Sequence, residues 1–445
     1  MNNDLFMIIP SAVLGTLLSS TLACIPGLHI YNIMGLLALA AFHATSGGYT
    51  LPTEIVIPFS IGLVVGYSIL NTIPAILLSA PDESAMFTVL PGRKFFMQGH
   101  GIDGVMITTI GSAAGLIMLL VLLAPLATTV LPVVKQVLRP HTHWIIWTVI
   151  TFMLMSEWPK GQPFGQAGLK RFLDACKTTG VGLLTFLLAG ILGFILFYSP
   201  TVATTAAFQN LMPAFVGLFT IPWLLLNIVS AFQAPPQEQK PSISVDSHTI
   251  LKGSFAGALG GGFAAFFPVV TGGVGGLLAG HATALNDSKA FLISQGTSKL
   301  VYYVGALLLF FVPQLGMRRG GGAWIISGIT TSYSHYEYYM ALCAIAISGA
   351  IALLLVAPLT RLTLSAINKF RLRKISSVAL ATIIIIVGGT TGMAGLFILM
   401  VATGIGLLPI LFGSRRMNCL GVILLPMACG MSGFGVTVAH WMRLI

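Results

Sequence analysis

The chain has 445 residues, of which 56% are hydrophobic and only 7% are charged, and its mean hydropathy is +0.95. Soluble domains carry about 25% charged residues, so this composition excludes a soluble protein and predicts an all-α polytopic membrane protein. A net charge of +11 would suggest nucleic-acid binding in a soluble protein. Here the basic residues lie in short connections between apolar segments, which instead indicates the cytoplasmic loops of a positive-inside topology and no nucleic-acid partner.

The first apolar stretch, residues 5–44, is interrupted in its middle by a Pro-Gly pair. One membrane crossing needs roughly 20 residues, so the stretch fits a broken pair of segments. Pro26 removes a backbone donor and Gly27 accepts backbone angles that other residues avoid, which predicts a broken or re-entrant helix. Freed backbone groups within a membrane must be buried in protein or face a wet cavity. The break is therefore a candidate substrate site, with His29 and Asn32 as its polar side chains; the alternative is a kinked helix that ends in polar residues.

The second apolar stretch, residues 54–78, ends with polar residues beside a proline, and two adjacent acids follow it. Asn71 and Thr72 either line the same cavity or belong to a plain kink. Asp82 and Glu83 are notable because the whole chain has only 11 acidic residues. They are candidates for binding a coupling cation or for a structural salt bridge with nearby basic residues. Adjacent positions on a helix point in different directions, so a catalytic carboxylate pair is not expected.

A Pro/Ser/Gln-rich polar run near the middle of the chain predicts a linker between two halves. The predicted domains are an N-terminal membrane repeat at 1–233, a polar linker at 234–249 and a C-terminal membrane repeat at 250–445. Together they are expected to hold about 10 to 12 transmembrane helices.

The opening pattern returns directly after this linker. Gly257 precedes Pro268 by eleven residues, just as Gly15 precedes Pro26. Paired interrupted segments in the two halves of a membrane protein are typical of the binding site of a secondary transporter. This spacing predicts an internal repeat in which each half has one Gly/Pro-broken re-entrant segment.

Polar residues near the second break complete the candidate site. Lys299 is costly at membrane depth, so it must snorkel to the interface, pair with an acid such as Asp287, or face a cavity as the counter-charge of an anionic substrate. Asp287 is therefore a candidate for ion coupling or for a structural role. The remaining candidate substrate-binding residues of this half are Pro268, Thr271, Gly272, Gly273, Ser294, Gln295, Thr297 and Ser298.

Several motifs resemble the large membrane subunit of the tripartite tricarboxylate transporters, and more closely the archaeal branch of that family, whose function is unknown. They are Ile-Pro-Gly-Leu-His at 25–29, Asn-Thr-Ile-Pro followed by Ala-Pro-Asp-Glu-Ser within 71–84, and Leu-Pro-Gly-Arg with its following glycines at 90–101. In the second half the resemblance covers Pro268, Asp287 with Phe291-Leu292, and the basic run at 318–320. The chain departs from the family pattern at Pro268-Val269, where Pro-Gly is expected.

The resemblance implies a transporter of two inverted repeats whose substrate is a small di- or tricarboxylate. We expect a secondary-active permease of the cell membrane that works by alternating access around its two broken helices, coupled to H⁺ or Na⁺. Expected partners are a small membrane subunit and an extracytoplasmic binding protein. The alternative is a carrier that flips an amphiphilic anion such as polyprenyl phosphate. No nucleophile-base spacing, closely spaced metal-ligand set or P-loop is present, so no enzyme, cofactor or metal site is expected.

Overall fold

The structure is a computed structural model that describes residues 2–30, 33–35, 52–158, 168–199, 201, 211–230, 234–283, 285, 287–329 and 334–445. All regular elements in this described part are helices, which confirms the predicted all-α class. The chain forms two compact units. Unit 1 comprises Met1–Gln136 and Trp223–Ile383, and unit 2 comprises Val137–Pro222 and Ile384–Ile445. Each unit is described by itself.

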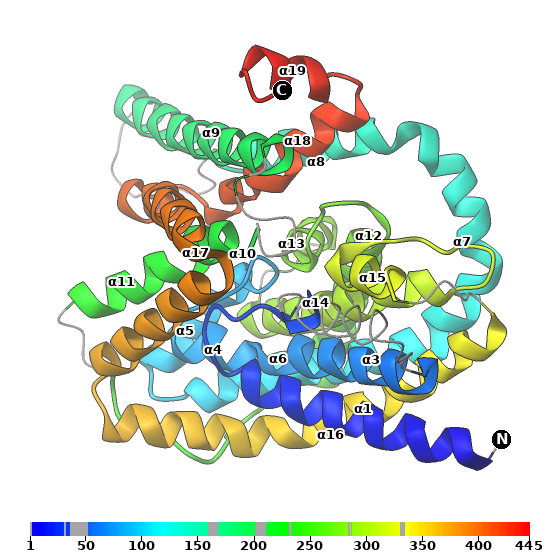
Figure 1. The fold of residues 1–445 in the computed structure, drawn as a ribbon. Helices are drawn as coiled ribbons and strands as arrows, with labels where there is room; N and C mark the ends of the chain where they lie inside the picture. Colours follow the sequence, from blue (N-terminus) through cyan, green and yellow to red (C-terminus); the bar gives the residue numbers. More distant parts are fainter. Residues whose placement is uncertain are drawn as a thin grey trace. The chain divides into compact units, whose positions relative to one another are not determined.

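Unit 1 contains two pairs of closely packed helices (Figure 1). In the first pair, α1 (Asn2–Leu22) packs along α3 (Thr53–Leu70). In the second pair, α12 (Ser247–Phe266) packs along α14 (Ser288–Phe311). The chain therefore forms the same kind of pair near its start and directly after its polar connector.

A glycine at the same distance before each proline makes the close approach within each pair. A Cβ atom added at Gly15 would lie 2.2 Å from the carbonyl oxygen of Phe59, and one at Gly257 would lie 2.4 Å from that of Ser294. Neither position has room for a larger residue, as is common where membrane helices pack through small residues. These matched contacts support the predicted repeat.

Both predicted breaks are present. Residues 23–29 are not helical and separate α1 from Ile30 and residues 33–35, which are helical. In the second half, α12 ends at Phe266 and α13 (Gly272–Ala282) begins after five further residues. Gly27 has φ of +79° and Val269 has φ of +58°. The residue after each proline thus has a left-handed conformation. β-Branched residues such as Val269 rarely adopt this conformation.

Shorter and longer helices complete unit 1. They are α4 (Thr72–Leu77), η1 (Met86–Thr88), α5 (Val89–Met97), α6 (Gly101–Met118), η2 (Leu119–Leu123), most of α7 (Ala124–Leu138), most of α11 (Ile221–Val229), α15 (Gly320–Ser327), α16 (His335–Lys369) and the start of α17 (Leu372–Phe412).

The polar connector is held against unit 1 by buried hydrogen bonds. The side-chain amide of Gln237 donates to the Phe96 carbonyl at 2.8 Å and accepts from the Gly101 N–H at 3.1 Å. Ser242 donates to the Asp103 carboxylate from its N–H at 2.8 Å and from its hydroxyl at 2.9 Å. Each compact unit also combines segments from both halves of the chain. The compact units therefore do not correspond to the two sequence repeats, and the repeat boundaries at the linker stay a prediction.

Unit 2 is built mainly around α9 (Gly168–Tyr198), which packs against α18 (Gly421–Met431). Within α17 the helical geometry is interrupted at Gly392, whose φ is +65°. The other elements of this unit are η3 (Arg139–His141), α8 (Thr142–Met155), α10 (Leu211–Phe215), η5 (Val216–Thr220), the start of α11 (Ile221–Val229), η6 (Arg416–Leu420) and α19 (Gly435–Trp441).

The described residues hold six helical segments that are long and apolar enough to cross a membrane, or seven if the bent pair Arg416–Met431 and Gly435–Trp441 is one span. This is fewer than the predicted 10 to 12. Two of the six, Gly101–Met155 and Leu372–Phe412, have 55 and 41 residues. At 1.5 Å per residue these are about 80 and 60 Å long, well above the roughly 30 Å hydrocarbon core. The chain is a multi-pass membrane protein, and these two segments are longer than a single crossing requires.

Candidate functional site

Asp82 lies in a non-helical turn at residues 79–85, which we call the acidic turn. One carboxylate oxygen accepts hydrogen bonds from the Tyr67 hydroxyl at 3.1 Å, the Asn71 amide at 2.6 Å and the Tyr303 hydroxyl at 2.9 Å. The other oxygen accepts from the backbone N–H groups two and three residues later, at 3.1 and 2.7 Å. Both oxygens of Asp82 are therefore surrounded by donors, which stabilise the ionised form.

Glu83 is contacted by both helix breaks. One of its carboxylate oxygens lies 3.2 Å from His29 Nε2 and 3.1 Å from the Tyr303 hydroxyl, which itself lies 3.1 Å from the same imidazole nitrogen. Its main-chain carbonyl accepts from the Thr271 hydroxyl at 3.4 Å. His29 and Thr271 each follow the proline of their break by three residues. Corresponding positions of the two breaks thus meet at one acidic residue.

Lys299 is only 1% exposed, so it does not snorkel to an interface. Its ammonium group donates to the side-chain oxygen of Asn71 and, at 2.6 Å, to the Thr72 hydroxyl. Asn71 in turn donates to Asp82, so one amide bridges the two opposite charges. Asp287 does not pair with this lysine. It is the N-cap of α14 and accepts from the Ala290 N–H at 2.9 Å.

The other predicted residues of α14 point in more than one direction. Ser298 donates to the Gly272 carbonyl at 2.7 Å and so ties α14 to the second break. Thr297 donates to the Gly111 carbonyl at 2.7 Å, which places it at the contact with α6. Ser294 and Gln295 are buried, and among the described residues their side-chain polar atoms have no hydrogen-bond partner. Their spacing along the helix explains the difference, since neighbouring residues cannot all face one site.

The two breaks also approach the acidic turn through small residues. A Cβ atom at Gly273 would lie 2.8 Å from the carbonyl oxygen of Ser84. Pro268 is buried, and Pro26 and Gly27 form the bend that brings His29 to Glu83. Asn32 lies outside the described residues.

The sequence prediction missed Tyr67 and Tyr303. Tyr67 precedes Asn71 by four residues and Tyr303 follows Lys299 by four, the helical spacing that puts side chains on one face. That spacing was the signal that would have found them. The expectation that Asp82 and Glu83 point in different directions was wrong. They lie in a turn and not on a helix, and both contact the Tyr303 hydroxyl.

The ligand atoms of His29, Asp82 and Glu83 all lie within 4.8 Å of one another. The sequence offered no compact ligand motif, because the first acid lies 53 positions after the histidine. The cluster has the composition of a cation site. Both oxygens of Asp82 already accept hydrogen bonds, however, so a metal ion would have to displace several donors.

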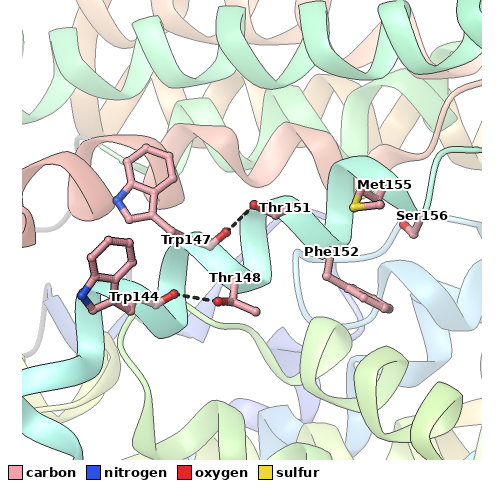
Figure 2. Close-up of a pocket in the computed structure, with 7 residues that line it drawn as sticks. All are labelled: Trp144, Trp147, Thr148, Thr151, Phe152, Met155 and Ser156. Atoms are coloured by element: carbon pink, nitrogen blue, oxygen red, sulfur yellow. Dashed lines mark hydrogen bonds between the residues drawn. The ribbon is translucent and has the colours of Figure 1, made fainter.

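A pocket of about 550 Å³ lies along α8 in unit 2 (Figure 2). Its lining is Trp144, Trp147, Thr148, Thr151, Phe152, Met155 and Ser156. The two threonine hydroxyls donate to carbonyls of their own helix, each at 2.9 Å. No charged side chain lines it, and Trp144 and Met155 are 66% and 71% exposed. These properties suit contact with apolar chains and not the binding of a small anion.

Comparisons with known proteins agree with the resemblance noted in the sequence. The family described as "Tripartite tricarboxylate transporter TctA family" matches residues 9–421. An uncharacterized protein of Methanocaldococcus jannaschii is 25% identical over 420 residues, which cover 93% of this chain and 96% of that protein. No solved structure matches.

Proposed function

The chain belongs to the tripartite tricarboxylate transporter TctA family, and from this premise we propose that it carries a small di- or tricarboxylate across the cell membrane by secondary active transport. The observation that carries the proposal is the buried network in unit 1. His29, Asn71, Asp82, Glu83 and Lys299 come from three separated parts of the sequence, at residues 29, 71–83 and 299, and are connected by hydrogen bonds. Buried ionisable groups in a membrane protein are costly and mark substrate or ion pathways.

Lys299 is the proposed counter-charge of the substrate. An ammonium group has three N–H donors, and two of them are used by Asn71 and Thr72. The third has no partner among the described residues and is suited to a carboxylate oxygen. A charge-assisted hydrogen bond of this kind is worth about 1.5–3 kcal/mol.

The break before α13 adds a second group of donors. This helix begins at Gly272, and its N-terminal turn lies beside the acidic turn. Backbone N–H groups at a helix N-terminus attract anions, and glycines permit close approach of a ligand. The two breaks together support a substrate site between half-helices, as in other secondary transporters.

Alternating access follows from this arrangement in the proposal. Both breaks contact Glu83, so a movement of one half relative to the other would change the contacts of this single residue. We propose that a small membrane subunit and an extracytoplasmic binding protein deliver the substrate, as in a tripartite system. In this scheme the described chain supplies the passage across the membrane, and it acts as a carrier and not as an enzyme.

Ligand-induced stabilisation tests the proposed function. Purified protein is heated with citrate or with polyprenyl phosphate, and the unfolding temperature is recorded for the wild type, Lys299→Ala and Lys289→Ala. Lys289 is a matched control, because it lies on the same helix but is partly exposed and, within the described part of the chain, donates to the Ser244 carbonyl alone, at 2.7 Å.

Citrate is expected to stabilise the wild type and the control, and Lys299→Ala is expected to bind it about 10- to 100-fold more weakly. Equal citrate binding by all three proteins would contradict the role given to Lys299. Stabilisation by polyprenyl phosphate alone would favour the lipid-carrier alternative.

A further inference from the structure

Asp82 and Glu83 are adjacent carboxylates with unequal surroundings. Asp82 accepts five hydrogen bonds through its two oxygens. Glu83 uses Oε1 alone, which lies 3.2 Å from His29 Nε2 and 3.1 Å from the Tyr303 hydroxyl, whose single proton it shares with Asp82. Among the described residues its Oε2 atom has no donor, although Glu83 is only 5% exposed. One oxygen of this pair is therefore buried without a partner.

Charge compensation is unequal as well. The ammonium of Lys299 and the carboxylate of Asp82 are bridged by Asn71, which balances one positive charge against one negative charge. Among the described residues Glu83 has no comparable cation unless His29 is protonated. A buried charge without compensation is costly, and binding a cation removes the cost.

The donor set favours a proton over a metal ion. Hard metal cations take about six or more oxygen ligands. Here both Asp82 oxygens face N–H and O–H donors, and His29 presents a ring nitrogen to Glu83. A proton needs one oxygen that accepts no hydrogen bond, and Glu83 Oε2 accepts none from the residues that the structure describes.

We propose that Glu83 is the site of the coupling ion, that this ion is a proton, and that it binds at Oε2 while Asp82 stays ionised and positions the surrounding donors. The inference deepens the proposed function by naming its coupling ion. In the binding step an O–H bond forms between Oε2 and a proton from the aqueous phase, and no bond within the protein breaks. Release on the other side of the membrane reverses the step.

The proton at Glu83 depends on several neighbours. The titratable groups close to it are His29 from the first break, Asp82 in the same turn, Tyr67 from α3, and Tyr302 and Tyr303 from α14. Lys299 is connected to Asp82 through Asn71 and has no direct contact with Glu83 among the described residues. Of these, His29 is the one whose ordinary titration range includes neutral pH. Proton binding at Glu83 should therefore be coupled to the state of His29.

Infrared difference spectroscopy tests the proposal without any substrate, so its outcome is separate from that of the transport assignment. Spectra of the purified full chain are recorded from about pH 5 to pH 9, a range in which ordinary carboxyl groups are ionised for the most part. The wild type is compared with Glu83→Gln, with Glu83→Asp and with Glu157→Gln, which removes a buried carboxylate in unit 2.

A protonated carboxyl C=O band that titrates in this range is expected in the wild type and in Glu157→Gln. The band should be absent in Glu83→Gln and shifted in frequency in Glu83→Asp. If the glutamine variant does not fold, the aspartate variant alone provides the test. The proposal is overturned if Glu83 contributes only ionised carboxylate bands across the whole range. It is also overturned if replacing choline chloride with sodium chloride removes the band at constant pH, because a metal cation would then occupy the site.

Discussion

At the scale of single residues, the number of hydrogen-bond donors around each carboxylate distinguishes Asp82, which positions its neighbours, from Glu83, which is proposed to bind and release a proton. Asp82 orients Asn71 and Tyr303, which in turn contact Lys299 and Glu83. Glu83 keeps one oxygen without a donor among the described residues. Substitutions of these two neighbours should therefore have different effects.

Asp82→Asn is expected to lower the free energy of unfolding by about 3–5 kcal/mol, because it leaves Lys299 buried without its bridged counter-charge and places an amide among donors. Glu83→Gln should cost less, since one oxygen of Glu83 makes no hydrogen bond that would be lost. Chemical unfolding of both variants in the same detergent measures the difference. Equal losses would show that the two carboxylates are both structural.

The sequence predicted many residues of this network but not their connections. His29, Asn71, Thr72, Asp82, Glu83 and Lys299 were recognisable because polar residues are rare in the apolar segments of this chain. The bridge from Lys299 through Asn71 to Asp82 joins residues more than 200 positions apart in the chain. Such a bridge depends on how α3 packs against α14, which the spacing of residues along one segment does not contain.

At the scale of the elements, the residue after the proline has a positive φ in both breaks, although it is Gly27 in one and Val269 in the other. Gly27→Val should destabilise the protein by about 1–3 kcal/mol, since it introduces a β-branched residue at positive φ. Val269→Gly should change stability by less, because relief of the strain offsets the lost side chain. Thermal unfolding of both variants measures this, and the opposite ranking would refute the account of the breaks.

The glycine contacts within the two helix pairs give a second prediction for the elements. Gly15→Ala and Gly257→Ala should both lower the unfolding temperature, because each new Cβ would meet a backbone carbonyl at 2.4 Å or less. Gly262→Ala is the control on α12, where a Cβ meets nothing within 4 Å. If only one of the two glycine variants is destabilised relative to the control, the helix pairs are not equivalent and the repeat loses support.

The start of α12 predicts a pH dependence outside the membrane-spanning segments. Asp246 is the N-cap of this helix, and hydrogen bonds from Thr249 lower the pKa of its carboxyl group. Its contribution to stability is therefore complete above the unfolded pKa near 3.9 and is lost as the pH falls through the lower folded value. Asp246→Asn should remove this part of the acid sensitivity. Thermal unfolding between about pH 5 and pH 2 compares the two proteins, and identical pH profiles would contradict the prediction.

At the scale of the whole molecule, composition was sufficient to predict an all-α membrane protein, but it did not predict how the chain divides. The polar connector marks the halves of the sequence, yet each compact unit takes segments from both halves. The connector itself packs into unit 1. Gln237 is only 5% exposed and forms hydrogen bonds with α5 and α6, although its neighbours in the sequence are polar and rich in proline. The number of crossings also differs from the prediction. Segments such as Gly101–Met155 are helical over more residues than one crossing needs, and the sequence alone did not reveal this continuity.

The central claim is that a small carboxylate crosses the membrane through the network around Lys299 and Glu83 and that a proton gradient drives this transport. Uptake of radiolabelled citrate into liposomes that contain the purified protein tests it most directly. With an inward proton gradient the wild type should accumulate citrate, Lys289→Ala should match it, and Lys299→Ala and Glu83→Gln should fall by at least about tenfold. Accumulation that persists in both network variants, or that requires a sodium gradient and ignores the proton gradient, would contradict the claim.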